Sequence, residues 1–306
     1  MIFRIIFLFF LATVSKSVAQ QTADNIVIPK IENPRFELNR GPRVFIDHKH
    51  NNFHQILGRF KPFADLLKAD GYQLDSILDY NKLQSNDILV ISNPIHPNNI
   101  RNWRQPIYNA FSDEDILHIE SWVKKGGKLL LIADHMPFAG AANALGYQFG
   151  FDFCDGFAQL TKETNNSPDI FDFGNNRLLD SEITDGNFGK KLKSITTFTG
   201  SSFTIPEKAK GILKFNKEDV CLAPEVAWQF REDTKEMNLE NSFQGAILNY
   251  EKGKLAVFGE AAMFTAQTIT NNSGTFKFGF HAENAPNNVD FIRNLMYWLS
   301  LNEKNK

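Results

Sequence analysis

Residues 128–137 read KLLLIADHMP, and they contain the clearest buried strand of the chain, Lys128 to Ala133, followed at once by Asp134 and His135. A short, continuously apolar run bounded by turn residues is typical of a strand covered on both faces, as in a parallel sheet. Residues 112–125 have helical spacing and end before Gly126-Gly127. A helix that leads into such a strand is typical of an α/β fold.

The same alternation extends outward in both directions. Further runs suited to buried strands lie at 44–46, 72–78, 88–92, 245–250 and 254–259. Helical spacing occurs at 52–70, 140–149 and 288–301, and Pro62 is expected to kink or break the first of these helices. We predict a three-layer α/β sandwich with a flavodoxin-like, mostly parallel sheet and a β-rich insertion at about 150–240, in the second half of the chain.

The first residues have the three-part layout of a secretory signal peptide, with a positive start, an apolar run from Ile5 to Val14 and small residues before position 20. The apolar run is too short to span a bilayer. We therefore expect a periplasmic or secreted protein without stable membrane insertion after signal cleavage, and an uncleaved anchor is the alternative. The predicted organisation is a signal peptide at 1–19, an N-terminal arm at 20–42 and a single domain at 43–302.

The composition narrows the class of partner. Hydrophobic residues make up 42% and charged residues 22% of the chain, as in an ordinary globular protein. The formal net charge is -2 and basic residues are not clustered, which argues against a nucleic-acid partner. Cys154 and Cys221 could pair in an oxidising compartment or stay apart, and two cysteines alone cannot complete a structural zinc site.

Polar residues follow the predicted strands where each of them ends. In open α/β sheets, ligands bind just beyond the carboxyl ends of the strands. Asp47 and His48 follow the first strand, Asn93 the third, Asp134 the 128–133 strand and Glu260 the 254–259 strand. We expect these side chains to share one site, because unpartnered carboxylates and imidazoles are costly to bury.

Two chemistries fit these residues. In the first, a divalent metal, with zinc as the favoured ion, is bound by Asp47, His48, His50 and His54 and activates a water for hydrolysis. His50 and His54 have the i, i+4 spacing that lets two imidazoles on a helix meet one ion. In the second, no cofactor is needed, and Asp134, His135 and Glu260 perform acid–base catalysis.

Four residues are candidates for binding the substrate: Asn52, Asn93, Trp103 and His281. Trp103 lies in the loop after the third strand, where it could stack on a sugar ring or simply cover the core. Structural roles compete with the others as well. Asp47 and Asp134 could cap the next helix, and His54 could be satisfied by backbone carbonyls.

Three segments carry a resemblance to a known family: VFIDHKHNNFH at 44–54, ADHMPF at 133–138 and FGEAAMF at 258–264. They resemble an exported bacterial family of the DUF4350 type, which has a class I glutamine amidotransferase-like fold. The resemblance implies a flavodoxin-like parallel sheet with helices on both faces. It does not imply amidotransferase activity, because Asp134 and His135 occupy the turn where that reaction needs a Cys nucleophile, and Cys154 lies well beyond it.

The sequence thus favours an exported hydrolase, metal-assisted or acid–base, that acts on a cell-envelope or glycan-type small molecule at the C-terminal edge of the sheet. A non-catalytic ligand-binding domain and a scaffold for an envelope partner are the alternatives.

Overall fold

The computed structural model describes residues 20–24, 30–160, 168–271 and 274–302. The predicted signal peptide lies outside these residues. The described chain is a mixed α/β protein built on a nine-stranded sheet. Eight strands follow one another across it, in the order β3 (Gln73–Ile77), β2 (Arg43–Asp47), β4 (Ile88–Ser92), β5 (Lys128–Ile132), β15 (Gly253–Phe258), β14 (Phe243–Tyr250), β10 (Phe203–Thr204) and β6 (Asp152–Phe153).

The sheet changes from parallel to antiparallel at β15. Strands β3, β2, β4, β5 and β15 are mutually parallel, whereas β14 runs antiparallel to β15 and pairs on its other edge with β10 and with β11 (Lys210–Lys214). The parallel half of the sheet therefore brings the carboxyl ends of its strands to one edge.

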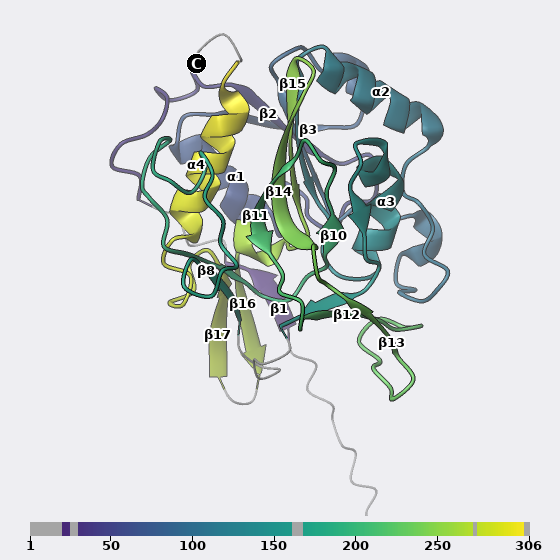
Figure 1. Cartoon of the computed structure of the whole chain (residues 1–306). Helices are drawn as coiled ribbons and strands as arrows, with labels where there is room; N and C mark the ends of the chain where they lie inside the picture. The colour runs from purple at the N-terminus through teal and green to yellow at the C-terminus, as the bar shows by residue number, and fades with distance from the viewer. Residues whose placement is uncertain (1–19, 25–29, 161–167, 272–273, 303–306) are drawn as a thin grey trace, which may run out of the picture.

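Helices cover both faces of this sheet. Helices α1 (Lys61–Ala69) and α4 (Asn288–Ser300) pack with side chains such as Val90 and Leu130 in one core cluster. Helices α2 (Asp113–Lys124) and α3 (Phe138–Gln148) pack with their neighbours Leu89 and Leu129 in the other. Figure 1 shows the two pairs on opposite sides of the strands. This coverage explains why β4, β5 and β15 are apolar and buried throughout.

Most predicted strands and helices of the parallel half are confirmed, with one exception. The predicted helix at 52–70 is wrong for residues 52–60, which form turns, and α1 begins only at Lys61. Pro62 lies in its first turn, where the missing N–H costs no hydrogen bond, so this proline starts the helix instead of kinking it. His50 and His54 are consequently not on a helix, and their i, i+4 spacing has no structural meaning.

The β-rich segment predicted at about 150–240 contains small sheets of its own. Strand β12 (Val220–Ala223) pairs with β7 (Phe157–Gln159) and β13 (Lys235–Asn238), and β8 (Asp169–Asp172) pairs with β9 (Ser194–Thr197). Cys154 and Cys221 form a disulfide that ties β12 to the chain between β6 and β7.

The N-terminal arm takes part in the fold. Its strand β1 (Gln20–Ala23) pairs with β16 (Ala266–Asn271), which pairs in turn with β17 (Gly274–Gly279). Three 3₁₀ turns complete the described elements: η1 (Tyr80–Lys82), η2 (Pro97–Asn99) and η3 (Ala262–Phe264). None of the helices in the described ranges has the length and apolar character that crossing a membrane requires.

Candidate functional site

A cavity of ≈ 340 Å³ opens at the carboxyl ends of β4, β5 and β15. Its polar walls come from His54, Arg59, Asn93, Asp134, His135 and Glu260. Its aromatic walls come from Phe53, Trp103, Phe138, Phe198, Trp228 and Phe278. The structure therefore gathers at one place all three predicted catalytic residues and two of the four predicted substrate-binding residues.

His135 lines this cavity with one of its two ring nitrogens engaged. Its Nδ1 lies 2.7 Å from the carbonyl oxygen of Met136, and because a carbonyl can only accept, Nδ1 carries the proton. In the neutral ring, Nε2 then holds a lone pair, and no group among the described residues hydrogen-bonds to it. The ring is fixed between Phe157, stacked at 4.7 Å, and the edge-on Trp228, also at 4.7 Å between centroids. A held imidazole with an unengaged basic nitrogen is equipped for proton transfer.

Asn93 positions Asp134 beside His135. The backbone N–H of Asp134 donates to Asn93 Oδ1 at 2.9 Å, and Asp134 Oδ1 accepts from the His135 N–H at 2.8 Å. Asn93 also accepts the backbone N–H of Phe53 on its carbonyl oxygen. Its φ of 49° lies in the left-handed region, which asparagine tolerates better than most residues. Asn93 was predicted to bind substrate. In the structure it lines the cavity, and it accepts hydrogen bonds from the backbones of two other lining residues, Phe53 and Asp134.

Glu260 is the most deeply buried carboxyl of the cavity, with a relative exposure of 1%. Its two oxygens accept the backbone N–H groups of Ala262 and Met263 at 2.6 and 2.7 Å. Burial, and then the nearby Asp134 carboxylate, raise the pKa of Glu260 well above its usual value, and the two backbone donors oppose this rise. The protonated form of Glu260 is therefore favoured.

His54 and Arg59 line another side of the cavity. The Nδ1 atom of His54 lies 3.1 Å from Ser92 Oγ, and its ring stacks on Phe60 at 4.7 Å. Burial first, and then the charges of Arg59 and His135, lower the pKa of His54 to about 3, so its ring is neutral at neutral pH. Arg59 was not predicted, because it lies among the turns that were read as a helix.

Trp228 is a second residue that the sequence analysis missed. It lies in the loop between β12 and β13, is 54% exposed and has a φ of 67°. Thr199, another lining residue, has a φ of 102°, which is rare for a β-branched side chain. Backbone strain of this kind is concentrated at binding and catalytic sites. Trp103, which was predicted, lies with its ring centroid 5.3 Å from that of Phe138.

Asp47 and His50 belong to a different cluster beneath α2. His50 Nδ1 lies 2.8 Å from Asp47 Oδ2, and Nε2 lies 3.4 Å from Asp115 Oδ2. Lys49 pairs with Asp115, and the Tyr80 hydroxyl lies 3.1 Å from His50 Nδ1. None of these residues lines the cavity, and together they join the end of β2 to the start of α2.

The remaining predicted residues have separate partners. His48 Nε2 accepts the backbone N–H of Ile56, and Asn52 bridges the backbone of His50 and Ser92. His281 pairs with Asp24 at 3.2 Å, away from the cavity. Of the predicted metal ligands, Asp47 and His50 meet, whereas His48 and His54 face other groups. The described residues contain no group of three or more His, Cys, Asp or Glu side chains suited to hold an ion.

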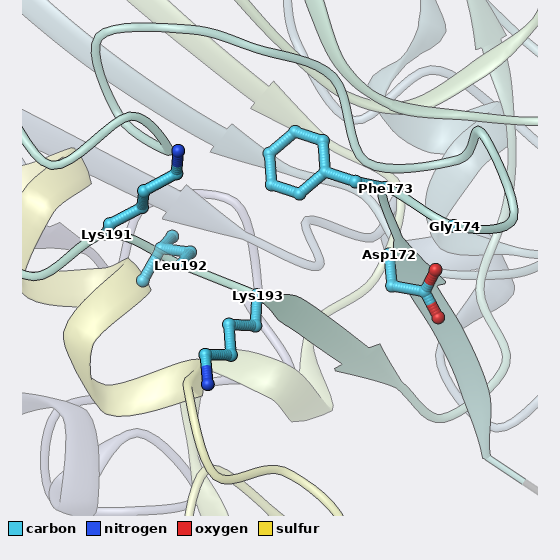
Figure 2. A pocket seen from close by; sticks show the side chains of 6 residues that line it. All are labelled: Asp172, Phe173, Gly174, Lys191, Leu192 and Lys193. Carbon is cyan, nitrogen blue, oxygen red and sulfur yellow. The ribbon is translucent and has the colours of Figure 1, made fainter.

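A larger cavity, of ≈ 400 Å³, lies at the β8–β9 region, between Phe173 and Leu192 (Figure 2). The amino groups of Lys191 and Lys193 point to opposite sides of it, and Asp172 points away from both. Its polar groups do not converge on one point, whereas those of the cavity at the strand ends do. This cavity is therefore the weaker candidate for a specific ligand-binding site.

No family model matches the chain, and no curated protein matches it in sequence. Among solved structures it is similar to the mmIFT52 N-terminal domain, with a TM-score of 0.57, 13% identity, and coverage of 85% of this chain and 98% of that one. Cytoplasmic proteins STM1381 and STM3548 from Salmonella typhimurium have TM-scores of 0.45 and 0.46 and identities of 13% and 12%. They cover 85% and 84% of this chain, and the matches span 97% and 98% of theirs. At this identity, the first likeness shows a shared fold alone.

Proposed function

We propose that this chain is an exported acid–base hydrolase whose substrate is a glycan-type small molecule of the cell envelope. The observation that carries the proposal is the state of His135, a lining residue whose Nδ1 is engaged by a carbonyl while Nε2 has no partner among the described residues. Asp134 and Glu260 line the same cavity. The tryptophans Trp103 and Trp228 support a ring-shaped substrate, since aromatic faces suit the apolar faces of sugars.

His135 Nε2 takes a proton from a water, and the water oxygen forms a bond to the substrate carbon that is attacked. The bond from that carbon to the leaving oxygen breaks, and the leaving oxygen receives the proton of the Glu260 carboxyl, whose pKa is raised by burial and by the Asp134 charge. Two neighbouring carboxyls of which one is buried are suited to hold such a proton, because both cannot be ionised without repulsion.

We also infer a flavodoxin-like, three-layer arrangement and an oxidising location. Numbered by their order along the chain, the five parallel strands β3-β2-β4-β5-β15 are arranged 2-1-3-4-5, which is the flavodoxin-like order, and this supports the resemblance to the class I glutamine amidotransferase-like fold. The Cys154–Cys221 disulfide supports export, because disulfides persist in oxidising compartments.

The test measures new reducing ends when residues 20–306 are incubated with a panel of envelope oligosaccharides. His135→Gln and Asp134→Asn should each lower kcat by ~10²- to 10⁴-fold, the usual contribution of a general acid or base, while sugar binding changes little. His118→Gln is the matched control, because His118 lies on α2 and does not line the cavity. Unchanged turnover in both cavity variants would refute the proposal, as would loss in the control. Turnover lost to EDTA and restored by zinc would assign the activated water to a metal instead.

A non-catalytic ligand-binding domain is the second candidate. It is favoured by Glu260, both of whose oxygens are already engaged by backbone donors. In that case the same panel would show sugar binding, with no hydrolysis in the wild type.

A further inference from the structure

We propose that Arg59 is a specificity residue that binds a carboxylate group of the ligand, so that the sugar taken by this cavity is a uronic acid. The inference rests on the proposed function only for the sugar character of the ligand. The anionic subsite itself follows from the geometry of Arg59.

The donors of Arg59 are only partly used. Its Nη1 donates to Gln267 Oε1 at 3.1 Å, and this is the one hydrogen bond of the guanidinium within the described residues. No carboxylate among those residues forms an ion pair with it. Nε and Nη2 have no hydrogen-bond partner among the described residues and neither atom is completely buried, so both remain able to donate to a ligand.

The open donors lie on one edge of the guanidinium. With Nη1 occupied, Nε and Nη2 form a side-on pair of parallel N–H groups, the arrangement that a carboxylate meets with both of its oxygens. A lysine offers no such fork. An uncharged hydroxymethyl group in the same place would leave a half-buried cation without a counter-charge, which costs binding energy.

Arg59 is also held in place before any ligand arrives. Its guanidinium carbon lies 4.6 Å from the centroid of the Phe53 ring, a cation–π contact. Its backbone oxygen accepts the Thr265 hydroxyl at 2.6 Å, and Gln267, its side-chain partner, is almost fully buried on β16. Burial lowers the pKa of Arg59, which still leaves an arginine charged at neutral pH.

The rest of the cavity complements an acidic sugar. Trp103 and Trp228 provide faces for a ring, and Asn93 and Asp134 provide polar groups for hydroxyls. Because burial and the Asp134 charge favour the protonated form of Glu260, the cavity carries fewer negative charges than its two carboxyls suggest. An anionic group therefore meets Arg59 without strong opposition.

The experiment compares sugars that differ at one carbon. Galacturonic acid, galactose and galactose 6-sulfate, and the three corresponding glucose compounds, are titrated into residues 20–306, with tryptophan fluorescence and calorimetry as readouts. The uronates should bind ~10- to 100-fold tighter than the neutral sugars, the range expected for hydrogen bonds to a charged group. This preference should shrink as salt is added.

Variants of Arg59 assign the preference. Arg59→Gln should bring uronate and neutral-sugar affinities to the same level, and Arg59→Lys should restore only part of the preference. Arg231→Gln, at an exposed arginine of the β12–β13 loop, is the matched control and should behave as the wild type.

Three results would overturn the inference: no uronate binding, a preference that survives in Arg59→Gln, or tighter binding of the 6-sulfates, which would assign a sulfate-type ligand. If the protein shows no turnover but its uronate preference depends on Arg59, this inference stands and the hydrolase proposal fails. If His135→Gln abolishes turnover but Arg59→Gln keeps the uronate preference, the hydrolase proposal stands and this inference fails.

Discussion

Two histidines of the cavity show how surroundings assign different roles to one side-chain type. His54 is sealed against Ser92 and Phe60, and burial lowers its pKa to about 3, so it stays neutral and structural. His135 is only half-buried, and its Nδ1 is engaged while Nε2 has no partner among the described residues. Exposure and one backbone carbonyl therefore distinguish the histidine that we propose as the proton acceptor.

Asp155 is a buried carboxyl whose titration changes the folding stability with pH in the opposite direction to that of His54. Its oxygens accept from Gln105 Nε2 at 2.9 Å and from the Gly140 N–H at 3.1 Å, yet burial raises its pKa from 3.8 to about 6. Between pH 3.8 and pH 6 the folded protein holds a proton on Asp155 that the unfolded chain lacks, so acidification through this range stabilises the fold. Between pH 3 and pH 6.5 the unfolded chain holds a proton that folded His54 lacks, so acidification destabilises it.

The two effects should nearly cancel between pH 6 and pH 4 in the wild type. Asp155→Asn removes only the stabilising effect, so this variant should lose ~2 kcal/mol more than the wild type over these two pH units, since the slope of ~1.4 kcal/mol per unit is reached only between the two pKa values. Urea unfolding at pH 4, 5 and 6 measures the difference. Asp233→Asn, at an exposed position, serves as the control. Parallel pH profiles for Asp155→Asn and the wild type would show that Asp155 titrates normally.

At the scale of elements, the small sheet of β7, β12 and β13 forms one wall of the site. The loop between β12 and β13 places Trp228 with its ring centroid 4.7 Å from that of His135 and 4.6 Å from that of Phe157. The disulfide ties β12 to the segment before β7. The sequence left the pairing of the two cysteines open. In the structure their disulfide anchors β12, the strand before the loop that carries Trp228.

The disulfide should contribute measurably to stability. It links residues 67 positions apart, so its removal enlarges the unfolded ensemble, and Cys154→Ala/Cys221→Ala should lose ~3 kcal/mol in urea unfolding. Wild type treated with dithiothreitol provides the matched comparison and should unfold near the double variant. If oxidised and reduced wild type unfold at the same urea concentration, the bond is not a stabilising element.

At the scale of the whole molecule, the first strand of the described chain pairs with a strand that comes more than 240 residues later and lines the cavity. Strand β1 pairs with β16, with Ala23 opposite Gln267 and Gln21 opposite Ile269. Gln267 and Ile269 both line the cavity, and Gln267 holds Arg59. The arm that was predicted to lie outside the domain therefore supports a wall of the site.

Deleting residues 20–24 should loosen that wall selectively. Backbone amides of 266–271 should exchange hydrogen at least ~10-fold faster, because β16 loses its partner on one edge, while α2 keeps the wild-type rate. Hydrogen exchange followed by mass spectrometry gives both rates in one sample. Equal exchange at 266–271 with and without β1 would show that the arm is only loosely attached.

The sequence predicted the elements whose patterns are local. Strands β4 and β5 are continuous apolar runs, and their ends correctly indicated Asn93, Asp134 and His135 at one edge. The turns at 52–60 were misread because Phe53, Ile56, Leu57 and Phe60 imitate helical spacing, although Leu57 is 86% exposed and Phe53 faces the cavity. Arg59 and Trp228 could not be found from spacing, because their roles depend on contacts between segments far apart in the chain.

The position of β15 in the sheet also determines when the cavity can form during synthesis. Its ladder with β5 joins Lys254 to Lys128, so the strand between β5 and β14 is made long after the strands on its parallel side. As the chain emerges from the ribosome or from a translocation pore, β5 presents an unpaired apolar edge until about residue 258 has appeared. Glu260, Gln267 and Phe278 are supplied later still. A nascent or prematurely ended chain without these residues therefore lacks the cavity.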